Sequence, residues 1–375
     1  MTTLSTAGSG GLKIRGLHKA YGSFKAVDGI DLDVPEGSFF ALLGPSGCGK
    51  TTTLRMVAGL EDPSSGAIEI GGTDIAALRP HQRPVNTVFQ SYALFPHMTI
   101  YENIAFGLRR RKVDGIDGKV REMLELVQMA HLAQRKPTQL SGGQQQRIAV
   151  VRALVNRPKV LLLDEPLGAL DLKLRRQMQL ELKRIQTEVG ITFIHVTHDQ
   201  EEAMTMADTI AVLNKGKDEQ MGAPVDLYEN PATAFVSGFL GQSNLLPATI
   251  VGRDGDVISL NTEGFRLAMP ARRAHSDGPQ VQVGVRPEKI QIADEGQAPG
   301  GNIIDGTIID ASFIGVSTQY LIRTPASEEL SVFSQNTATT LRQVGERVSV
   351  YWDPAHTFAL ASDAAEIAFA AEVAS

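Results

Sequence analysis

A glycine-rich segment between an apolar run and a helix-compatible run has the composition of a phosphate-binding loop. Residues 44–51 read Gly-Pro-Ser-Gly-Cys-Gly-Lys-Thr, which fits the spacing G-x-x-x-x-G-K-[ST]. Small residues let backbone N–H groups converge on phosphate oxygens, and the next helix directs its dipole at the same charge. Lys50 would neutralise the β- and γ-phosphates, and Thr51 would bind Mg²⁺. The expected nucleotide-binding residues are Gly44, Pro45, Ser46, Gly47, Cys48, Gly49, Lys50, Thr51 and Thr52.

The same loop has features of a dinucleotide-binding turn and, through Cys48, of a redox centre. Gly47-Cys48-Gly49 is a G-x-G, but no third glycine follows at the spacing that a dinucleotide-binding turn needs. Cys48 is the only cysteine, so no internal disulfide is possible, and we expect it to fill space in the loop. The simplest alternative to a nucleotide site is a strand-to-helix turn in which Lys50 is solvated.

Two adjacent carboxylates follow a second apolar run, Val-Leu-Leu-Leu at 160–163. This composition is typical of a strand buried on both faces, which would place Asp164 and Glu165 at the carboxyl edge of a parallel sheet. We expect Asp164 to hold Mg²⁺ through water and Glu165 to polarise the attacking water. Acidic turns at strand ends are common, so this prediction depends on the phosphate loop.

A second helix start with phosphate-binding character lies at residues 140–147, Leu-Ser-Gly-Gly-Gln-Gln-Gln-Arg. Ser141 is a good N-cap, and Gly142 and Gly143 leave the first amides of the helix bare. An ordinary capped helix start explains the same residues.

Strand-like runs alternate with amphipathic helical stretches from about Leu12 to Gly241. The expected strands are 39–43, 160–163, 192–196 and 210–213, and the expected helices include 120–129 and 172–189. This alternation is typical of a mainly parallel sheet covered by helices. After Gly241, short alternating runs predict a small barrel or sandwich. We expect domains at 12–241 and 242–362, with loose ends at 1–11 and 363–375.

The composition excludes several classes of protein. The chain has 42% hydrophobic and 21% charged residues, and no apolar run approaches the ~18 residues of a membrane-spanning helix. Its formal charge of −6 argues against non-specific nucleic-acid binding, which needs a basic surface. The first residues lack the basic and apolar regions of a signal peptide, so we expect a cytoplasmic protein.

The segment 140–147 resembles the signature motif of the ATPase subunits of ATP-binding cassette (ABC) transporters. Other elements of that family follow in order: Tyr21 ahead of the first expected strand, Gln90 in Val-Phe-Gln-Ser, Leu-Gly-Ala-Leu-Asp at 167–171, and His198 in Val-Thr-His-Asp. The resemblance implies an α/β P-loop NTPase cassette with a helical insertion at about 91–150. It also implies a small all-β, OB-like (TOBE) barrel behind the cassette.

The resemblance implies roles for these residues. Tyr21 would stack on adenine, a contact worth ~1–3 kcal/mol, although a surface or core tyrosine is the ordinary alternative. Gln90 would touch Mg²⁺ or the attacking water, against the alternative of a polar loop residue. His198 would contact the γ-phosphate and join Glu165 and Lys50 as the catalytic residues.

Two further residues have weaker assignments. His195 lies in the same expected strand as His198 but has no family role, so we expect it to be structural. Asp171 would cross a dimer interface, although a helix N-cap explains it almost as well.

The resemblance also implies partners. ATP would lie between Lys50 of one chain and Ser141, Gly142, Gly143 and Gln144 of a second copy, in a head-to-tail dimer. The apolar and aromatic stretch 91–103 would contact two transmembrane permease subunits at the cytoplasmic face of the cell membrane, or else pack in the core. A solute-binding protein outside the cytoplasm would be an indirect partner, and no nucleic acid is expected.

Two segments bear on the solute. Arg286-Pro287-Glu288 resembles an element of the barrel behind import-type ATPases, and 85–98 resembles the spermidine/putrescine importer subfamily. Asp218 stands where relatives usually carry an apolar strand residue, so we expect it to loosen the packing of its strand at the edge of the sheet. An ATPase that drives polyamine import is therefore expected. The alternatives are import of a sugar, iron or phosphonate, and a non-transport ABC ATPase that acts on nucleic acid or ribosomes; the latter usually has two cassettes or a long coiled-coil insert.

Overall fold

The computed structural model describes residues 10–168, 170–276, 278–336 and 341–362. Its contacts divide the chain into two compact units, residues 1–224 and 225–375. Residues 1–9 and 363–375 of the expected loose ends lie outside the described residues. Gly10 and Gly11 pack against Gly71, whose N–H donates to the Gly11 carbonyl (3.1 Å). None of the helices in the described part of the chain combines the length and apolarity that a membrane span needs.

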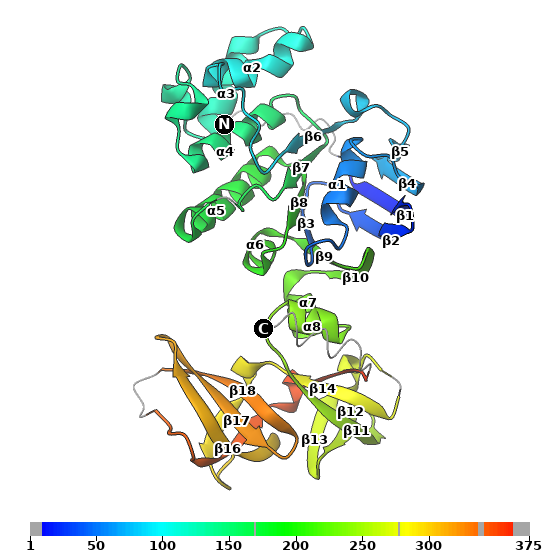
Figure 1. Cartoon of the computed structure of the whole chain (residues 1–375), viewed down its shortest axis with the longest axis vertical. Helices are drawn as coiled ribbons and strands as arrows, with labels where there is room; N and C mark the ends of the chain where they lie inside the picture. Colours follow the sequence, from blue (N-terminus) through cyan, green and yellow to red (C-terminus); the bar gives the residue numbers. More distant parts are fainter. Residues whose placement is uncertain (1–9, 169, 277, 337–340, 363–375) are drawn as a thin grey trace. The chain divides into compact units, whose positions relative to one another are not determined.

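The first unit is built on a mainly parallel sheet with the strand order β10-β9-β3-β8-β7-β6 (Figure 1). Its strands are β3 (Phe39–Leu43), β6 (Val85–Val88), β7 (Val160–Asp164), β8 (Thr192–Thr197), β9 (Thr209–Asn214) and β10 (Lys217–Gly222). Because all four expected strands lie in it, the prediction of a parallel sheet is confirmed. The edge strand β10 pairs antiparallel to β9 with a register shift between Asp218 and Gln220.

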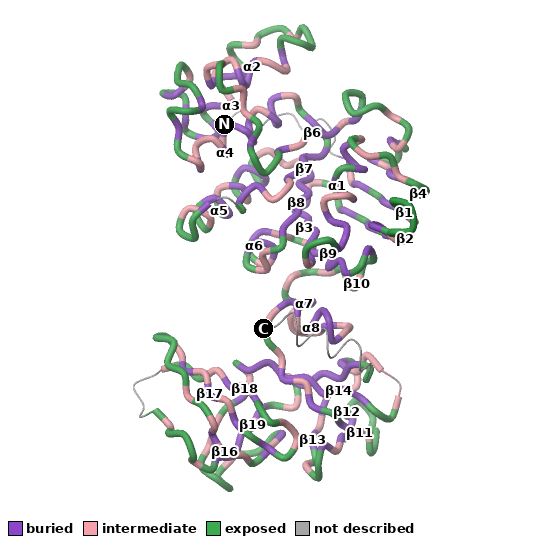
Figure 2. Tube along the Cα trace, in the orientation of Figure 1, coloured by how far each residue is buried: buried purple, intermediate pink, exposed green. Residues whose placement is uncertain are grey.

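Successive residues of the central strands point to opposite faces of this sheet, as the pleat of a strand requires. In β7, Leu162 packs with α1 (Lys50–Ala58), whereas Leu161 and Leu163 pack with the helices on the other face. Both faces are covered, so these strands are buried along their length (Figure 2). The uninterrupted apolar runs in the sequence have this physical cause.

A separate antiparallel sheet, which the sequence did not predict, covers α1. Its strand order is β2-β1-β4-β5, with β1 (Leu12–Tyr21), β2 (Phe24–Val34), β4 (Ser65–Ile70) and β5 (Thr73–Asp74). Tyr21 lies ahead of β3, the first expected strand, but it also ends β1, a strand that the sequence did not predict. The pairing of β1 with β2 shifts register at three places, and these irregularities break the period-2 pattern that marks a strand.

The helices of the first unit begin and end at recognisable signals. They are α1, α2 (Ile100–Arg110), α3 (Ile116–Leu126), α4 (Gly142–Leu154), α5 (Leu172–Val189) and α6 (Gln200–Met206). The helix expected at 172–189 is confirmed: Asp171 caps it and Gly190 ends it at φ 72°. The helix expected at 120–129 instead begins at Ile116 and ends before Gln128, whose φ of 59° is left-handed. The insertion contains α2, α3 and α4 (Figure 1).

The second unit is mostly antiparallel β-structure, as expected for an all-β domain. One sheet has the order β13-β12-β11-β14-β20 and the other β15-β19-β16-β17-β18, and side chains of both form one core. The strands are β11 (Asn244–Asp254), β12 (Val257–Thr262), β13 (Phe265–Pro270), β14 (Gln280–Val285), β15 (Gln291–Asp294), β16 (Asn302–Phe313), β17 (Ser317–Thr324), β18 (Ser327–Gln335), β19 (Arg347–Trp352) and β20 (Phe358–Ala361).

Arg286 ties two short helices to these sheets. Its guanidinium is buried, lies 4.0 Å from the centroid of the Tyr228 ring, and donates to the carbonyls of Tyr228 (2.8 Å), Ser237 (2.9 Å) and Gly241 (3.1 Å). These groups lie on or beside the helices α7 (Pro224–Glu229) and α8 (Ala234–Phe239). The compact units consequently divide at Pro224, ahead of the boundary expected near Gly241.

Candidate functional site

The phosphate-binding loop connects β3 to α1 and opens into a cavity. Gly49 precedes α1 at φ 104°, no side chain caps the helix, and its first turn contains no acidic residue. The first amides of α1 are thus available to an anion. The cavity of about 330 Å³ is lined by Tyr21, Phe24, Ala26, Ser46, Gly47, Gly49, Lys50, Thr51, Thr52 and Glu165.

Two glycines of the loop leave no room for a side chain. A Cβ at Gly44 would lie 2.3 Å from the Leu213 carbonyl oxygen, and one at Gly49 would lie 2.5 Å from that of Ala26. Both distances are far below van der Waals contact. The glycines that suggested a phosphate loop are therefore also required by the neighbouring backbone.

Lys50 is buried at the base of the loop. Its Nζ donates to the carbonyl oxygens of Gly44 (2.7 Å) and Pro45 (2.8 Å) and lies 3.7 Å from the Cys48 sulfur. Burial raises the pKa of the Cys48 thiol, which keeps it neutral. This arrangement fits the expected role of Cys48 as a small buried residue, because a reactive cysteine needs a lowered pKa and access to solvent.

Two oxygen donors meet beside the loop. The hydroxyl of Thr51 lies 3.4 Å from Oδ1 of Asp164, the last residue of β7. Burial raises the pKa of Asp164, and the Glu165 carboxylate adds to the shift, while Arg55 and Thr51 lower it. A positive charge bound here would favour the ionised carboxylate.

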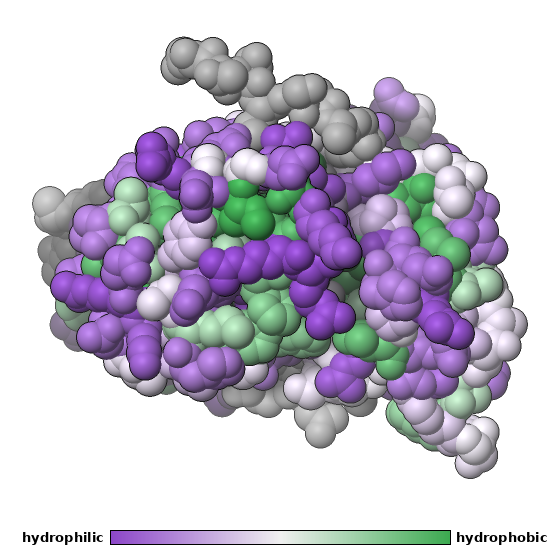
Figure 3. Space-filling model, turned by 90° about the horizontal axis from the view of Figure 1, so that it is seen from above, coloured by the Kyte–Doolittle hydropathy of each residue, from purple (hydrophilic) through white to green (hydrophobic). Residues whose placement is uncertain are grey.

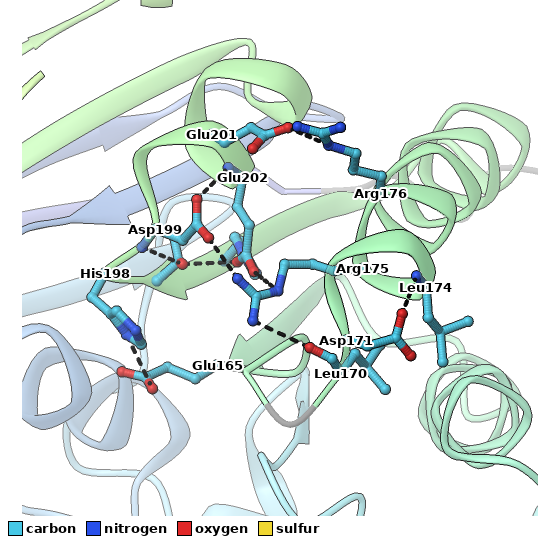
Figure 4. A network of polar contacts seen from close by, with 12 residues as sticks. Glu165, Leu170, Asp171, Leu174, Arg175, Arg176, His198, Asp199, Glu201 and Glu202 are labelled. Carbon is cyan, nitrogen blue, oxygen red and sulfur yellow. Dashed lines mark hydrogen bonds and ion pairs between the residues drawn. The ribbon is translucent and has the colours of Figure 1, made fainter. Parts of the chain in front are cut away.

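Glu165 begins the turn after β7 in a conformation that non-glycine residues seldom adopt, with φ 45°. Its amide donates to the Val196 carbonyl (3.1 Å), which fixes the turn against β8. Its Oε2 lies 3.4 Å from Nδ1 of His198, the residue after β8 (Figure 4). Two of the three expected catalytic residues, Glu165 and His198, therefore meet at the carboxyl edge of the sheet, because β7 and β8 are parallel neighbours.

His195 is a structural residue, in agreement with the expectation. Its ring is fully buried, and Nε2 lies 3.0 Å from Oε2 of Glu202 in α6. Thr197 donates to the same carboxylate oxygen (2.8 Å). These contacts hold α6 against β8, and His195 is not among the residues that line the cavity.

Tyr21 and Phe24 form the aromatic wall of the cavity. They are paired residues across the turn between β1 and β2, and both side chains are at least half exposed. The Nζ of Lys19 lies 5.0 Å from the centroid of the Tyr21 ring and 2.5 Å from the Glu61 carboxylate. Phe24 is not among the residues expected from the sequence; an aromatic residue three positions after Tyr21, across a Gly-Ser turn, is the signal that could have found it.

Gln90 follows β6 and is exposed. A Cβ at Gly168 would lie 3.4 Å from its Nε2, so Gln90 is beside the turn that follows Glu165. In the stretch after Gln90, Tyr92 is buried, and the ring of Phe95 packs against Phe106 (4.8 Å between centroids). Part of this stretch is thus core, as the alternative proposed, while Phe95 and several neighbours stay partly exposed.

The signature residues lie apart from those that line the cavity. Ser141 caps α4, with its Oγ accepting from the Gln144 amide (3.4 Å) and its own amide donating to the Gln144 side chain (3.0 Å). A Cβ at Gly143 would lie 2.9 Å from the Leu174 side chain in α5. Asp171 caps α5 by accepting from the Leu174 amide (3.0 Å). The starts of α4 and α5 therefore pack together, and the N-cap alternative for Asp171 is confirmed.

Two families match the sequence. Residues 27–168 match the ABC transporter family and residues 283–360 match the TOBE domain. The first match spans the phosphate loop, Gln90, the signature residues, Asp164 and Glu165, while Tyr21, Asp171 and His198 lie outside it. The chain belongs to the ABC transporter family and is one of its ATP-binding, ATP-hydrolysing subunits.

Two relatives match nearly the whole chain. The spermidine/putrescine import ATP-binding protein PotA of Thermobifida fusca is 52% identical over 341 residues, which are 89% of this chain and 88% of the relative. The protein of the same name from Rubrobacter xylanophilus is 51% identical over 356 residues, 93% of each chain.

Two solved structures resemble part of the chain. A nucleotide-free ATP-binding cassette from an ABC transporter superposes with a TM-score of 0.51 at 26% identity, over 57% of this chain and 91% of that one. A dimeric post-hydrolysis cassette bound to ADP and Pi superposes with a TM-score of 0.50 at 32% identity, over 57% and 98%.

Proposed function

We propose that this chain hydrolyses MgATP to drive the import of a polyamine such as spermidine or putrescine. The relatives that match 88–93% of their own length carry the name of spermidine/putrescine import ATP-binding proteins. This similarity extends beyond the nucleotide site through the second unit. The observation that carries the proposal is this match over the full length, because the nucleotide cavity itself would serve any solute.

In the cavity and at the adjacent carboxyl edge of the sheet, each residue would have its own role. Lys50 and the bare amides of α1 would hold the phosphates, and Tyr21 would stack on adenine. Glu165 would orient and polarise the attacking water, and His198 would contact the γ-phosphate. The 3.4 Å contact between Glu165 and His198 supports this assignment, since it places both side chains at the same edge of the sheet.

The residues beside the loop fit a Mg²⁺ ion. The side chains of Thr51 and Asp164 present oxygen atoms that lie 3.4 Å apart. Gln90 lies near the turn that follows Asp164 and Glu165. Among the residues that the structure describes, no cluster of three or more His, Cys, Asp or Glu forms an all-protein metal cage. This fits Mg²⁺, which usually takes only one or two protein oxygens and completes its shell with water and phosphates. Bound there, it would neutralise charge on the phosphates.

Hydrolysis would take place in a head-to-tail homodimer. Ser141, Gly142, Gly143 and Gln144 do not line the cavity of their own chain, and Ser141 at the start of α4 is exposed, so this helix start would contact the nucleotide of a second copy. Asp171 would lie at the same interface, because the starts of α4 and α5 pack together. The similar cassette bound to ADP and Pi is dimeric, which supports a dimer of this chain.

Two permease subunits at the cytoplasmic face of the membrane would contact the helical insertion. Figure 3 looks onto the side of the first unit that carries α2 and shows hydrophobic residues exposed between hydrophilic ones. Phe89 is exposed, and Leu94, Phe95 and Met98 are partly so. An exposed apolar surface of this kind suits a helix of a partner subunit. A solute-binding protein would act on the permease from the other side.

Uptake measurements test the proposed solute. A strain that lacks this chain is expected to lose uptake of labelled spermidine and putrescine, and the wild-type chain, but not its Lys50→Ala variant, is expected to restore it. Restored uptake of a sugar, iron or phosphonate instead would overturn the polyamine assignment while keeping import. Unchanged uptake of all these solutes would contradict import itself.

Tyr21→Ala is expected to weaken MgATP binding about tenfold while turnover at saturating ATP stays near wild type. Base stacking of ~1–3 kcal/mol is felt similarly in the ground and transition states, so the loss appears in KM. Tyr21→Phe keeps the ring and is the matched control, with an expected KM close to wild type. A large fall in turnover with unchanged affinity would contradict the stacking role.

A further inference from the structure

Arg175, in the first turn of α5, bridges two turns that come from different parts of the chain. Its Nη2 donates to the Leu170 carbonyl (3.2 Å), and its Nη1 donates to Oδ2 of Asp199 (2.9 Å). Its Nε lies 3.9 Å from Oε1 of the buried Glu202. Figure 4 shows the guanidinium between these three groups. Leu170 directly precedes Asp171, and Asp199 directly follows His198.

The residues on both sides of His198 are held by the same network. Thr197 donates to Glu202 Oε2 (2.8 Å) and accepts from the Asp199 amide (3.0 Å). Asp199 also caps α6, since its Oδ1 accepts from the Glu202 amide (3.1 Å). His198 itself is exposed and its ring contacts Glu165. The backbone position of His198 is therefore set by its two neighbours, and one of them is paired with Arg175.

An arginine is required for this geometry. A planar guanidinium presents several N–H groups in fixed directions, so it binds a carbonyl and a carboxylate at the same time. A lysine has the charge but not the fixed plane. Leu170 and Asp199 are the partners of the guanidinium in the two turns, and the backbone amide of Arg175 also donates to the Asp171 carbonyl (2.8 Å).

We infer that Arg175 is a positioning residue of the hydrolysis reaction, which couples the place of His198 to the turn that carries Asp171. This inference rests on the proposed function, in which the second copy contacts Asp171 and the γ-phosphate contacts His198. Movement of either turn on dimer closure changes the position of the other through the guanidinium. When ATP bridges two copies, His198 is therefore already positioned to contact the γ-phosphate. MgATP binding by a single chain does not depend on Arg175.

Arg175→Gln in the full chain tests the inference. The expected result is a fall in kcat of ~10–100-fold, the size of effect that small misplacements of reacting groups produce, with KM and the Kd of MgATP within about twofold of wild type. Arg176→Gln is the matched control. Arg176 is the next residue of α5, and its side chain pairs with Glu201 of α6 (2.8 Å). This exposed pair contacts neither turn, so wild-type kinetics are expected.

Two further variants separate positioning from folding. Asp199→Asn keeps the cap of α6 but removes the charge that pairs with Arg175, and it is expected to lower kcat without changing KM. Arg175→Lys is expected to restore only part of the lost kcat. Full restoration by lysine would show that charge alone suffices and would overturn the bridging role.

The remaining outcomes are equally decisive. Wild-type kcat in folded Arg175→Gln and in Asp199→Asn would overturn the inference. Proportionate loss of kcat, MgATP affinity and thermal stability in both variants would show a structural role and would also overturn it. His198→Ala is the reference: if it lowers kcat while Arg175→Gln does not, the inference fails and the proposed function stands. A wild-type chain without MgATP hydrolysis would overturn the proposed function and the inference together.

Discussion

Replacing Lys50 by alanine is expected to lower the ATPase turnover of the full chain by ~10²–10³-fold, as the loss of one positioned electrostatic donor does in other active sites. Lys50 is the only cation among the described residues that line the cavity, and its Nζ lies at the base of the phosphate loop. Without it, the β- and γ-phosphates lose their protein cation where charge develops during transfer. Steady-state phosphate release measures the effect.

The control for this prediction is Lys119→Ala. Lys119 lies on α3, and its Nζ donates to the Asp114 carbonyl (2.7 Å), outside the residues that line the cavity. Wild-type turnover is expected. Thermal unfolding of Lys50→Ala should be recorded as well, because its lost hydrogen bonds to loop carbonyls cost ~1–3 kcal/mol. Normal turnover in a folded Lys50→Ala chain would contradict our assignment of the loop.

Glu165→Gln is expected to bind MgATP and to slow hydrolysis by ~10²–10⁴-fold, the usual contribution of a general base. The amide keeps the size of the carboxylate but cannot polarise the water by its charge. The left-handed φ of 45° at this position is no harder for glutamine than for glutamate. Because hydrolysis is what opens the proposed dimer, ATP should hold two copies of this variant together.

Light scattering coupled to gel filtration measures that dimer. Glu165→Gln should elute as a monomer without nucleotide and as a dimer with MgATP. Adding Ser141→Arg should keep it monomeric, because a bulky cation would occupy the phosphate contact offered to the opposite chain. A monomer at saturating MgATP and low salt, with binding verified, would contradict the composite site.

Short contiguous motifs by themselves determine much of the nucleotide site. The loop at 44–51, the carboxylates after 160–163 and the capped start at Ser141 each depend on neighbours in sequence, since glycines, caps and strand ends act locally. The helix at 172–189 is predictable to the residue because Asp171 and Gly190 are strong end signals. Cys48 and His195 also have the buried, structural places expected of them, the former from its small-residue loop and the latter from its position within a strand.

Other features are decided only by tertiary structure. The sheet of β1, β2, β4 and β5 escapes prediction because register shifts interrupt its alternation, and Phe24 becomes a cavity wall only through the hairpin that this sheet forms. Arg286 binds α7 and α8 to the second unit through hydrogen bonds to their backbone carbonyls, which any residue type can provide. Arg175 bridges two turns through the nearby Leu170 carbonyl and the Asp199 carboxylate. Contacts to backbone carbonyls across long sequence separations leave no local pattern, so amino-acid spacing cannot reveal them. Glu165 and His198, by contrast, come together because they follow β7 and β8, which are parallel neighbours in the folded sheet.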